Sequence, residues 1–440
     1  MRFTFTQRAA PFCEVGFDDI RIEHTAGKWD THAWDAAEAT WSGIEPTWRD
    51  VSCEVWEANC EYGRAALTDR FVPGQATVLA RNVSGWGDPH QHGMRPGRPI
   101  RFGVDHAIFG RVIVFRGFID SVVPTYDPMT MPTVELQCID TLGEVNRSAL
   151  VPYPQDDQAV PPIVLPGEGE TGDERVHHLL DRAAWPTLKR DIAPTATTLI
   201  AHEQGGQMAD LLGQVADSIG GVVWGDLEGN VGLRARDWQM FDPTQPTDAT
   251  IGNVEPTDVC PGQWQRPFDR ASISTRVIMG RDAETAVQVD DIDGQMLYGI
   301  ESFERVDLLT QIDAVIADLA ERTLEARHHT TAPRVRAVTI DAAAGPEQLD
   351  LIAGVDVFKP SHYRCRLIEK DGRLVFDDRY MAVAVGHTIT ASAWTLEMNL
   401  DLAAPYEAAG ASRWNDGRWD TATWTAALAS LRADLERTNA

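Results

Sequence analysis

Two series of short, strand-like segments constrain the fold of this chain more than any other feature. The first series runs from Trp48 to Val145 and contains VSCEVWEANCEYGR, GQATVLARN, PIRFGV, RVIVFRGFIDSVV and TVELQCIDTLGEV. Each segment is rich in β-branched, apolar or aromatic residues and is bounded by Gly, Pro, Asn or Asp, as short strands joined by turns are. The series predicts a small β barrel or sandwich over residues 48–150.

A second series of similar length lies near the other end of the chain. It contains ASISTRVIMG, RVRAVTI, YRCRLI, RLVFDDRYMAVAVGHTIT and AWTLEMNLDL. A helix from Val306 to Arg327 interrupts it, because apolar residues recur there at helical spacing. We therefore expect a second barrel over residues 254–402 that includes this helix. The similar lengths suggest an internal duplication, although no residue-level repeat is evident.

The region between the two series has a different pattern. Residues 151–172 carry five prolines and predict a long surface connection. Two helical segments follow, ERVHHLLDRAAW and GGQMADLLGQVADSIGG, and then GVVWGDLEGNVGLRARDW predicts a hairpin that turns near Gly229. We expect an α+β insert over residues 151–253. The fold class is accordingly α+β, mainly β, with two barrels, an insert and a helix interrupting the second barrel.

The charge balance is strongly acidic. There are 66 Asp and Glu residues against 39 Lys and Arg residues, which gives a formal net charge of -27. Because nucleic acids and anionic membranes bind through clustered Lys and Arg, this balance argues against tight binding to either. One explanation of the acidity is that it keeps the protein soluble.

Targeting signals and cysteine motifs give no other class. The N-terminus shows no signal-peptide pattern, and no stretch approaches the ~20 apolar residues of a membrane helix. The six cysteines form no CxxC pair and are sparse for a disulfide scaffold. We expect a protein made in a reducing cytoplasm, with most cysteines buried as small apolar side chains.

Both ends of the chain are rich in tryptophan. The residues concerned are Trp29, Trp34, Trp41 and Trp48 near one end, and Trp414, Trp419 and Trp424 near the other. Since exposed tryptophan is costly, these rings must pack on something, either on the chain itself or on a partner. We treat residues 1–47 as an extension and residues 403–440 as a C-terminal segment with a helix near Leu431. Trp29, Trp34, Trp41, Trp414, Trp419 and Trp424 are the candidate interface residues.

Possible metal ligands occur in patterns of low specificity. His90 and His92 lie near Asp88, but HxH with one acidic residue is more typical of a polar turn. The histidine pairs at 177–178 and 328–329 are on expected helices, where neighbouring side chains point about 100° apart. The DDIDG segment at 290–294 lacks the spacing of a calcium-binding loop. We predict no metal and no cofactor.

The same holds for catalytic motifs. Ser42 and Ser218 are not in GxSxG, and the chain contains no HExxH, P-loop or GxGxxG motif. Carboxylates are so numerous that pairing any two as a glycosidase dyad has no specificity. The chain is therefore expected not to be an enzyme, and no catalytic residue is assigned.

The order of several phrases resembles a known family. GRAALTDRFVPGQATVLARN, MRPGRPIRFGV, VIVFRGFIDSVVPTY and VELQCIDTLGEV are similar to the N-terminal half of siphophage minor tail proteins. LLGQVADSIGGVVWGDLEGNVGLRARDW, LYGIESFERVDLLTQIDAVIADLAERTLEARHHTTAPRVRAVTI and VGHTITASAWTLEMNLDL fit later parts of the same family. The similarity covers residues 48–402, and its strength comes from the order and spacing of the phrases.

This resemblance implies a baseplate-hub, or tail-associated, protein. In that family two tube-like barrels per subunit let a homotrimer imitate a six-fold ring and stack on the hexameric tail tube through the distal tail protein. Expected partners are the distal tail protein, the tape-measure protein, other tail-tip proteins and a host-surface glycan. An acidic lumen would let DNA pass without adhesion. The chain departs from some relatives, because residues 403–440 resemble no lytic or peptidase domain.

The sequence thus predicts a structural component of a virion tail tip, with two alternatives. One is a distal tail protein in a six-fold ring. The other is a glycan-binding or cell-wall-cleaving tail protein that uses the Trp-rich ends.

Overall fold

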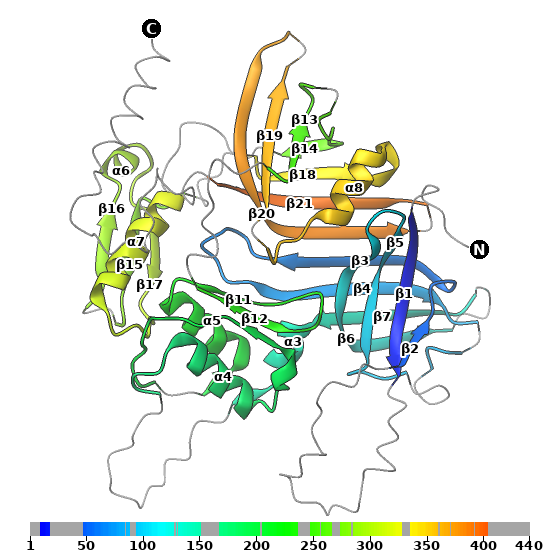
Figure 1. Cartoon of the computed structure of the whole chain (residues 1–440), viewed down its shortest axis with the longest axis horizontal. Coiled ribbons are helices and arrows are strands. Elements are labelled where there is room, and N and C mark those ends of the chain that lie inside the picture. Colours follow the sequence, from blue (N-terminus) through cyan, green and yellow to red (C-terminus); the bar gives the residue numbers. More distant parts are fainter. Residues whose placement is uncertain are drawn as a thin grey trace, which may run out of the picture.

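A computed structural model shows that the chain is mainly β, with most of its helices gathered toward one end (Figure 1). It describes residues 9–17, 47–83, 85–88, 94–126, 129, 131–150, 167–202, 205–235, 247–255, 257–265, 273–282, 285–327, 335–359, 361–369, 371–390 and 392–403. The largest element is a 13-stranded, mostly antiparallel sheet. The predicted α+β, mainly β class is confirmed.

The first predicted strand series forms one half of this sheet. Its strands are β3 (Val55–Gly63), β4 (Val72–Arg81), β5 (Pro99–His106), β6 (Gly110–Thr125) and β7 (Thr133–Asp140), hydrogen-bonded in the order β3-β4-β7-β6-β5. The end of the series differs from the prediction. Thr141–Asn146 is helix α3, which begins there because the Asp140 carboxylate accepts a hydrogen bond from the Gly143 N–H.

Residues 1–47 were expected to form an extension before the first barrel, but residues 9–17 belong to the large sheet. Strand β1 (Ala9–Phe17) pairs with β5, and β2 (Thr47–Asp50) pairs with β1. Phe12, Cys13 and Val15 are buried. Burial on both faces removes the apolar–polar alternation that identifies a strand in sequence, so the pattern of the segment gave little signal.

The second strand series forms the other half of the same sheet. Its strands are β14 (Gln263–Gln265), β18 (Ala337–Asp341), β19 (His362–Ile368), β20 (Leu374–Thr390) and β21 (Trp394–Leu402). They are hydrogen-bonded in the order β14-β18-β21-β20-β19, and β13 (Ala249–Gly252) adds to β19 in parallel. The short helices η4 (Ala342–Ala344) and α8 (Pro346–Gly354) connect β18 to β19.

The two halves repeat one topology. The order β3-β4-β7-β6-β5 in the first half corresponds, strand by strand, to β14-β18-β21-β20-β19 in the second. In each half the long strand, β6 or β20, pairs with the preceding strand over its first part and with the following strand over its last part. The structure therefore contains the internal repeat that the similar lengths suggested.

The halves are joined edge to edge. Strand β3 pairs with the last part of β20, from Gly63 opposite Ala384 to Glu57 opposite Thr390. Gly63 has a φ of +131°, and a Cβ atom there would lie 2.4 Å from the Ala384 Cα atom. Only glycine fits this close approach, so the join depends on it.

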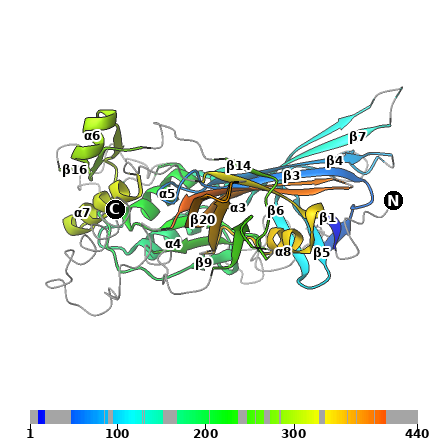
Figure 2. The same ribbon diagram turned by 90° about the horizontal axis from the view of Figure 1, so that it is seen from above.

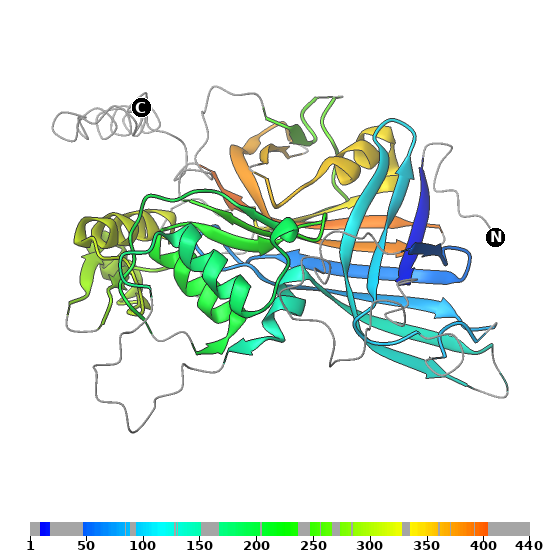
Figure 3. The same ribbon diagram turned by 60° about the horizontal axis from the view of Figure 1, so that its bottom comes forward.

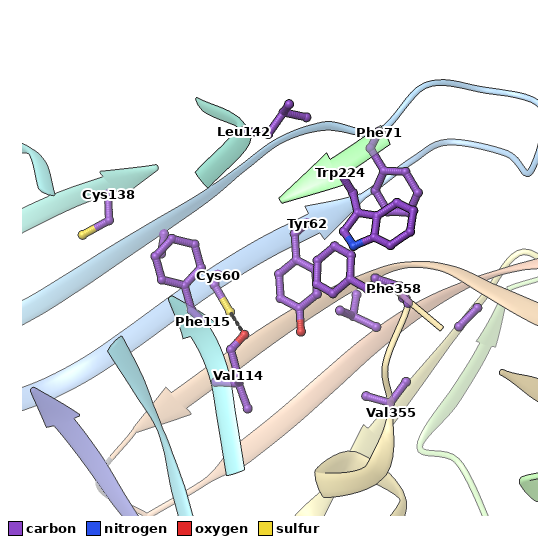
Figure 4. Packing of buried hydrophobic residues seen from close by; sticks show 14 of the residues in the cluster. Cys60, Tyr62, Phe71, Val114, Phe115, Cys138, Leu142, Trp224, Val355 and Phe358 are labelled. Atoms are coloured by element: carbon purple, nitrogen blue, oxygen red, sulfur yellow. Dashed lines mark hydrogen bonds between the residues drawn. The ribbon is translucent and has the colours of Figure 1, made fainter. Parts of the chain in front are cut away.

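One hydrophobic core runs through the join and into the insert. Tyr62 stacks on Phe358 at 5.2 Å between ring centroids, and Phe71 lies 5.9 Å from Phe358 and 6.1 Å from Trp224 (Figure 4). The Cys60 thiol donates to the Val114 carbonyl at 3.7 Å. The core therefore combines residues from both halves of the sheet and from the insert.

The insert contains the two predicted helices and the predicted hairpin. Helices α4 (Gly172–Arg182) and α5 (Met208–Ser218) pack beside a three-stranded sheet of β9 (Arg190–Ile192), β11 (Val222–Gly225) and β12 (Val231–Arg234) (Figure 3). The β11–β12 hairpin turns where the Asp226 carboxylate accepts from the Glu228 and Asn230 N–H groups. The expected boundary at residue 253 is late, because β13 already belongs to the large sheet.

A separate small unit replaces part of the expected second barrel. Strands β15 (Arg276–Met279), β16 (Val287–Asp290) and β17 (Ser302–Arg305) form their own sheet, which carries α6 (Ile292–Tyr298) and α7 (Asp313–Arg327). The predicted helix start at Val306 is wrong. Leu308 and Leu309 are adjacent but pack into different hydrophobic clusters, which requires extended backbone before the helix.

Candidate assembly surfaces

The six tryptophans predicted to form an interface lie outside the described residues. Trp29, Trp34 and Trp41 precede residue 47, and the other three follow residue 403. Their role stays a prediction. Trp48, from the same run, lies on β2, where the Arg101 guanidinium stacks over its ring at 4.1 Å. This tryptophan is therefore bound to the sheet of its own chain.

A charged cluster holds β1 against the β5–β6 hairpin. The buried Glu14 carboxylate contacts Arg101 and Arg111, each at 2.8 Å, and the Arg111 guanidinium lies over the Phe12 ring at 4.2 Å. Because both arginines come from the β5–β6 hairpin, these contacts hold the N-terminal strand in register.

Ser218 and the DDIDG segment, both considered in the sequence analysis, have structural partners. The Ser218 hydroxyl donates to the Gln214 carbonyl at 2.6 Å and accepts from the Leu309 N–H at 2.7 Å. The Asp291 carboxylate caps α6 by accepting from the Gly294 N–H. Both side chains therefore bind backbone groups of their own chain.

The histidine predictions are tested only in part. His178 lies 2.6 Å from the Glu170 carboxylate, a pair exposed at the surface. Ser42, His90, His92 and residues 328–329 fall outside the described ranges. Within those ranges, no three His, Cys, Asp or Glu side chains are arranged to hold a metal ion.

A cavity of about 100 Å³ lies where the large sheet, the insert and the small unit meet. The Asp217 side chain is 7% exposed and forms ion pairs with two arginines. Arg70 comes from the large-sheet region, and the Arg305 Nη1 atom, from β17, lies 2.6 Å from the Asp217 Oδ1 atom. Burial raises the pKa of the Asp217 carboxyl, and the two arginines oppose that shift. The cluster joins three parts of the molecule through one carboxylate.

The far end of the β6–β7 pair is an unusually apolar projection. The two strands reach beyond their neighbours (Figure 2). Val123, Tyr126, Met129 and Met131 are 44%, 61%, 90% and 48% exposed. An exposed apolar cluster of this kind is typical of an interaction surface. In the sequence this segment is recognisable only as a strand, and the large side chains of Tyr126, Met129 and Met131 among turn-forming residues are the signal for the apolar projection.

Helix α6 and the residues just after it carry a second exposed apolar group. Four apolar side chains there are more than half exposed: Ile292, Met296, Leu297 and Ile300.

None of the described helices is long and apolar enough to cross a membrane.

Comparisons with known proteins identify the fold. No protein-family model and no curated protein sequence matches the chain. A tail protein from Neisseria meningitidis MC58 superposes with a TM-score of 0.55 at 12% identity, over 83% of this chain and 98% of that one. The 43 kDa tail protein of prophage MuSo2 from Shewanella oneidensis gives a TM-score of 0.51 at 11% identity, over 80% of this chain and 95% of that one. The chain therefore has a fold similar to that of these tail proteins over nearly their whole length.

Proposed function

We propose that this protein is a structural component of a bacteriophage tail tip, a hub that closes the distal end of the tail tube. It is made in the host cytoplasm and becomes part of the virion. It acts in tail assembly, DNA passage and host attachment. The internal repeat carries this proposal, because one chain supplies two equivalent halves of a sheet.

The repeat fits a trimer at the end of a six-fold tube. Three copies with two tube-like halves each present six equivalent units, and closed cyclic assemblies are the usual form of such rings. The fold shared with two tail proteins supports the same assignment. The expected partners are the distal tail protein, the tape-measure protein and other tail-tip proteins.

The net charge fits the passage of DNA. A formal charge of -27 gives an acidic surface, and phosphate is repelled by such a surface. In the proposed hub the lumen binds no DNA tightly. We propose no catalytic role: of the candidates considered, the Ser218 hydroxyl is bound to the Gln214 carbonyl and the Leu309 N–H, and His178 pairs with Glu170.

The oligomeric state tests the proposal. We expect light scattering of the purified chain to give a trimer, and negative-stain images to show a three-fold ring with six similar lobes. A six-fold ring would favour the distal tail protein alternative. A monomer at all accessible concentrations would refute the hub. Reproducible release of sugar or peptide from host cell wall would favour the cell-wall-cleaving alternative.

A further inference from the structure

The last part of β6 has an open edge. Strand β5 pairs with β6 only from His106 opposite Gly110 to Pro99 opposite Phe118. On its other side β6 pairs with β7 from Gly117 to Thr125. No described strand pairs with the β5 side of β6 over Ser121–Thr125.

The equivalent edge in the second half is occupied. Strand β19 covers β20 as far as His362 opposite Met381, and β3 then pairs with the same strand from Ala384 to Thr390. The same edge of a long strand thus holds two partners in the second half and one in the first.

The two long strands match residue by residue at this point. The register with the following strand shifts between Ile119 and Ser121 in β6, and between Ala382 and Ala384 in β20. Each shift begins one residue after the last pair with the preceding strand, at Phe118 or Met381. Ser121 is therefore the counterpart of Ala384, which is the first residue of β20 that β3 covers.

The strand equivalent to β3 also has one side open. Strand β14 pairs with β18, as β3 pairs with β4, and β14 ends the sheet on its other side. Trp264 lies opposite Val338 as Ala58 lies opposite Val78, so Trp264 is the counterpart of Ala58. Within one chain, β3 pairs with the last part of β20. The outer edge of β14 has no described strand as a partner.

We propose that β14 of one copy lies antiparallel beside the end of the open β6 edge, at Thr125 and Tyr126, in a second copy, repeating between chains the contact of the start of β3 with the end of β20. The inference rests on the proposed oligomer and names its contact. In the join within the chain, Ala58 of β3 lies opposite Ile389 of β20, and Asn59 lies opposite Thr388. The equivalent register between copies places Trp264 opposite Tyr126 and Gln265 opposite Thr125.

The chemistry of the two edges supports this pairing. Residues 121–126 are SVVPTY and β14 is QWQ, so neither edge carries a charged side chain. Charges, proline and short length all limit pairing at a sheet edge; the β6 edge has Pro124 and β14 has three residues, whereas β2, at the opposite end of the sheet, contains the charged Arg49 and Asp50. The proposed contact therefore uses Thr125 and Tyr126, beyond Pro124. The exposed Tyr126 ring would gain an aromatic cross-strand partner in Trp264.

The contact closes a ring. Each copy gives a different edge to each of its two neighbours, so the interface is head to tail and forms a closed cycle when the rotation permits. An internal join and an intercopy join of the same geometry would then alternate around the ring.

A register-specific cross-link tests the proposal. The exposed Cys53 and Cys260 are first replaced by serine, and Gln265→Cys is then combined with Thr125→Cys. We expect mild oxidation to give disulfide-linked oligomers up to the trimer on non-reducing gels. The matched control combines Gln265→Cys with Val123→Cys. It is two residues out of register, at a Cα separation of about 7 to 8 Å that a disulfide spans poorly.

A second variant tests the same edge without cysteine. Val123→Lys with Tyr126→Lys places charges at two exposed positions, and we expect it to give a folded monomer. Leu188→Lys alters an equally exposed apolar residue of the insert and should leave the oligomer intact.

The outcomes separate this contact from the hub itself. An oligomer that cross-links only in the Gln265–Thr125 pair supports the contact. An oligomer that does not cross-link there, or that survives the double lysine variant, overturns the contact and leaves the hub standing. A disulfide that forms only within single chains, and therefore migrates as a monomer, also overturns the contact. A chain that is monomeric before any substitution refutes the hub and the contact together.

Discussion

Protonation of His387 should weaken the join between the two halves of the sheet. This histidine lies on β20 opposite Cys60 of β3, is 2% exposed, and its Nδ1 atom accepts from the Trp394 Nε1–H at 3.2 Å. Its Nε2 atom has no hydrogen-bond partner among the described residues. Burial lowers the pKa of His387 to about 3 from an ordinary value of 6.5.

The sign and size of the effect follow from this shift. Between pH 6.5 and about pH 3 the unfolded chain binds a proton at this position and the folded chain does not, so stability falls as the pH falls. At 1.36 kcal/mol per pH unit, lowering the pH from 7 to 4.5 should cost about 3 kcal/mol through this residue. The adjacent Cys60 and Tyr62 do not titrate in this range, because their ordinary pKa values of 9.0 and 10.0 lie above it and burial raises both further.

Urea unfolding of the wild type and of His387→Gln at pH 7 and pH 4.5 measures the effect. Glutamine does not titrate, and its amide oxygen can accept from Trp394. The free energy of unfolding should fall with acid by about 3 kcal/mol more in the wild type than in the variant. Equal losses in both proteins would refute the assignment of a neutral, buried histidine at the join.

Three further changes test the packing of the two halves and the insert. Gly117→Ala should lower the free energy of unfolding by about 3 kcal/mol in urea, because its Cβ would lie 2.0 Å from the Ile139 carbonyl oxygen, whereas Gly354→Ala, with open space around it, should cost nothing. Burial raises the pKa of Asp140 to about 7, so this residue should make stability fall as the pH rises from 4 to 7; an unchanged slope in Asp140→Asn would contradict this. Asp217→Asn should cost about 2 kcal/mol, since two partly exposed arginines lose their carboxylate, and proteolysis should then cut more readily around the small unit; wild-type resistance would show that the cluster does not hold the units together.

The sequence predicted the strands well because local patterns determine them. The five strands from β3 to β7 have apolar runs bounded by turn residues, and all five are present. The structure explains why the FRGFID phrase contains a glycine. Its Gly117 pairs with Ile100 of β5 and Asp140 of β7 at once, where β6 passes from one neighbour to the other and leaves no room for a side chain.

What the sequence could not show depends on contacts between distant residues. The strands between residues 276 and 305 have the same kind of local sequence pattern as the strands of the second half. Only the pairing of β15 with β16 and β17 shows that they form a separate sheet. The same holds for the candidate contact surface. Nothing local in SVVPTY shows that one edge of that strand is open, because the open edge appears only when β6 is compared with β20.

The two joins should differ in strength, and the difference follows from their residues. Counting from Ser121 and Ala384, Pro124 holds the place in β6 that His387 holds in β20. A proline has no N–H to donate, so the proposed join between copies can form fewer hydrogen bonds there. The join within the chain is buried beside Tyr62 and Phe358, whereas Val123 and Tyr126 are exposed in the single copy. A subunit built in this way folds its own join as part of its core and forms the second one only on meeting another copy, the order that assembly from separately made chains requires.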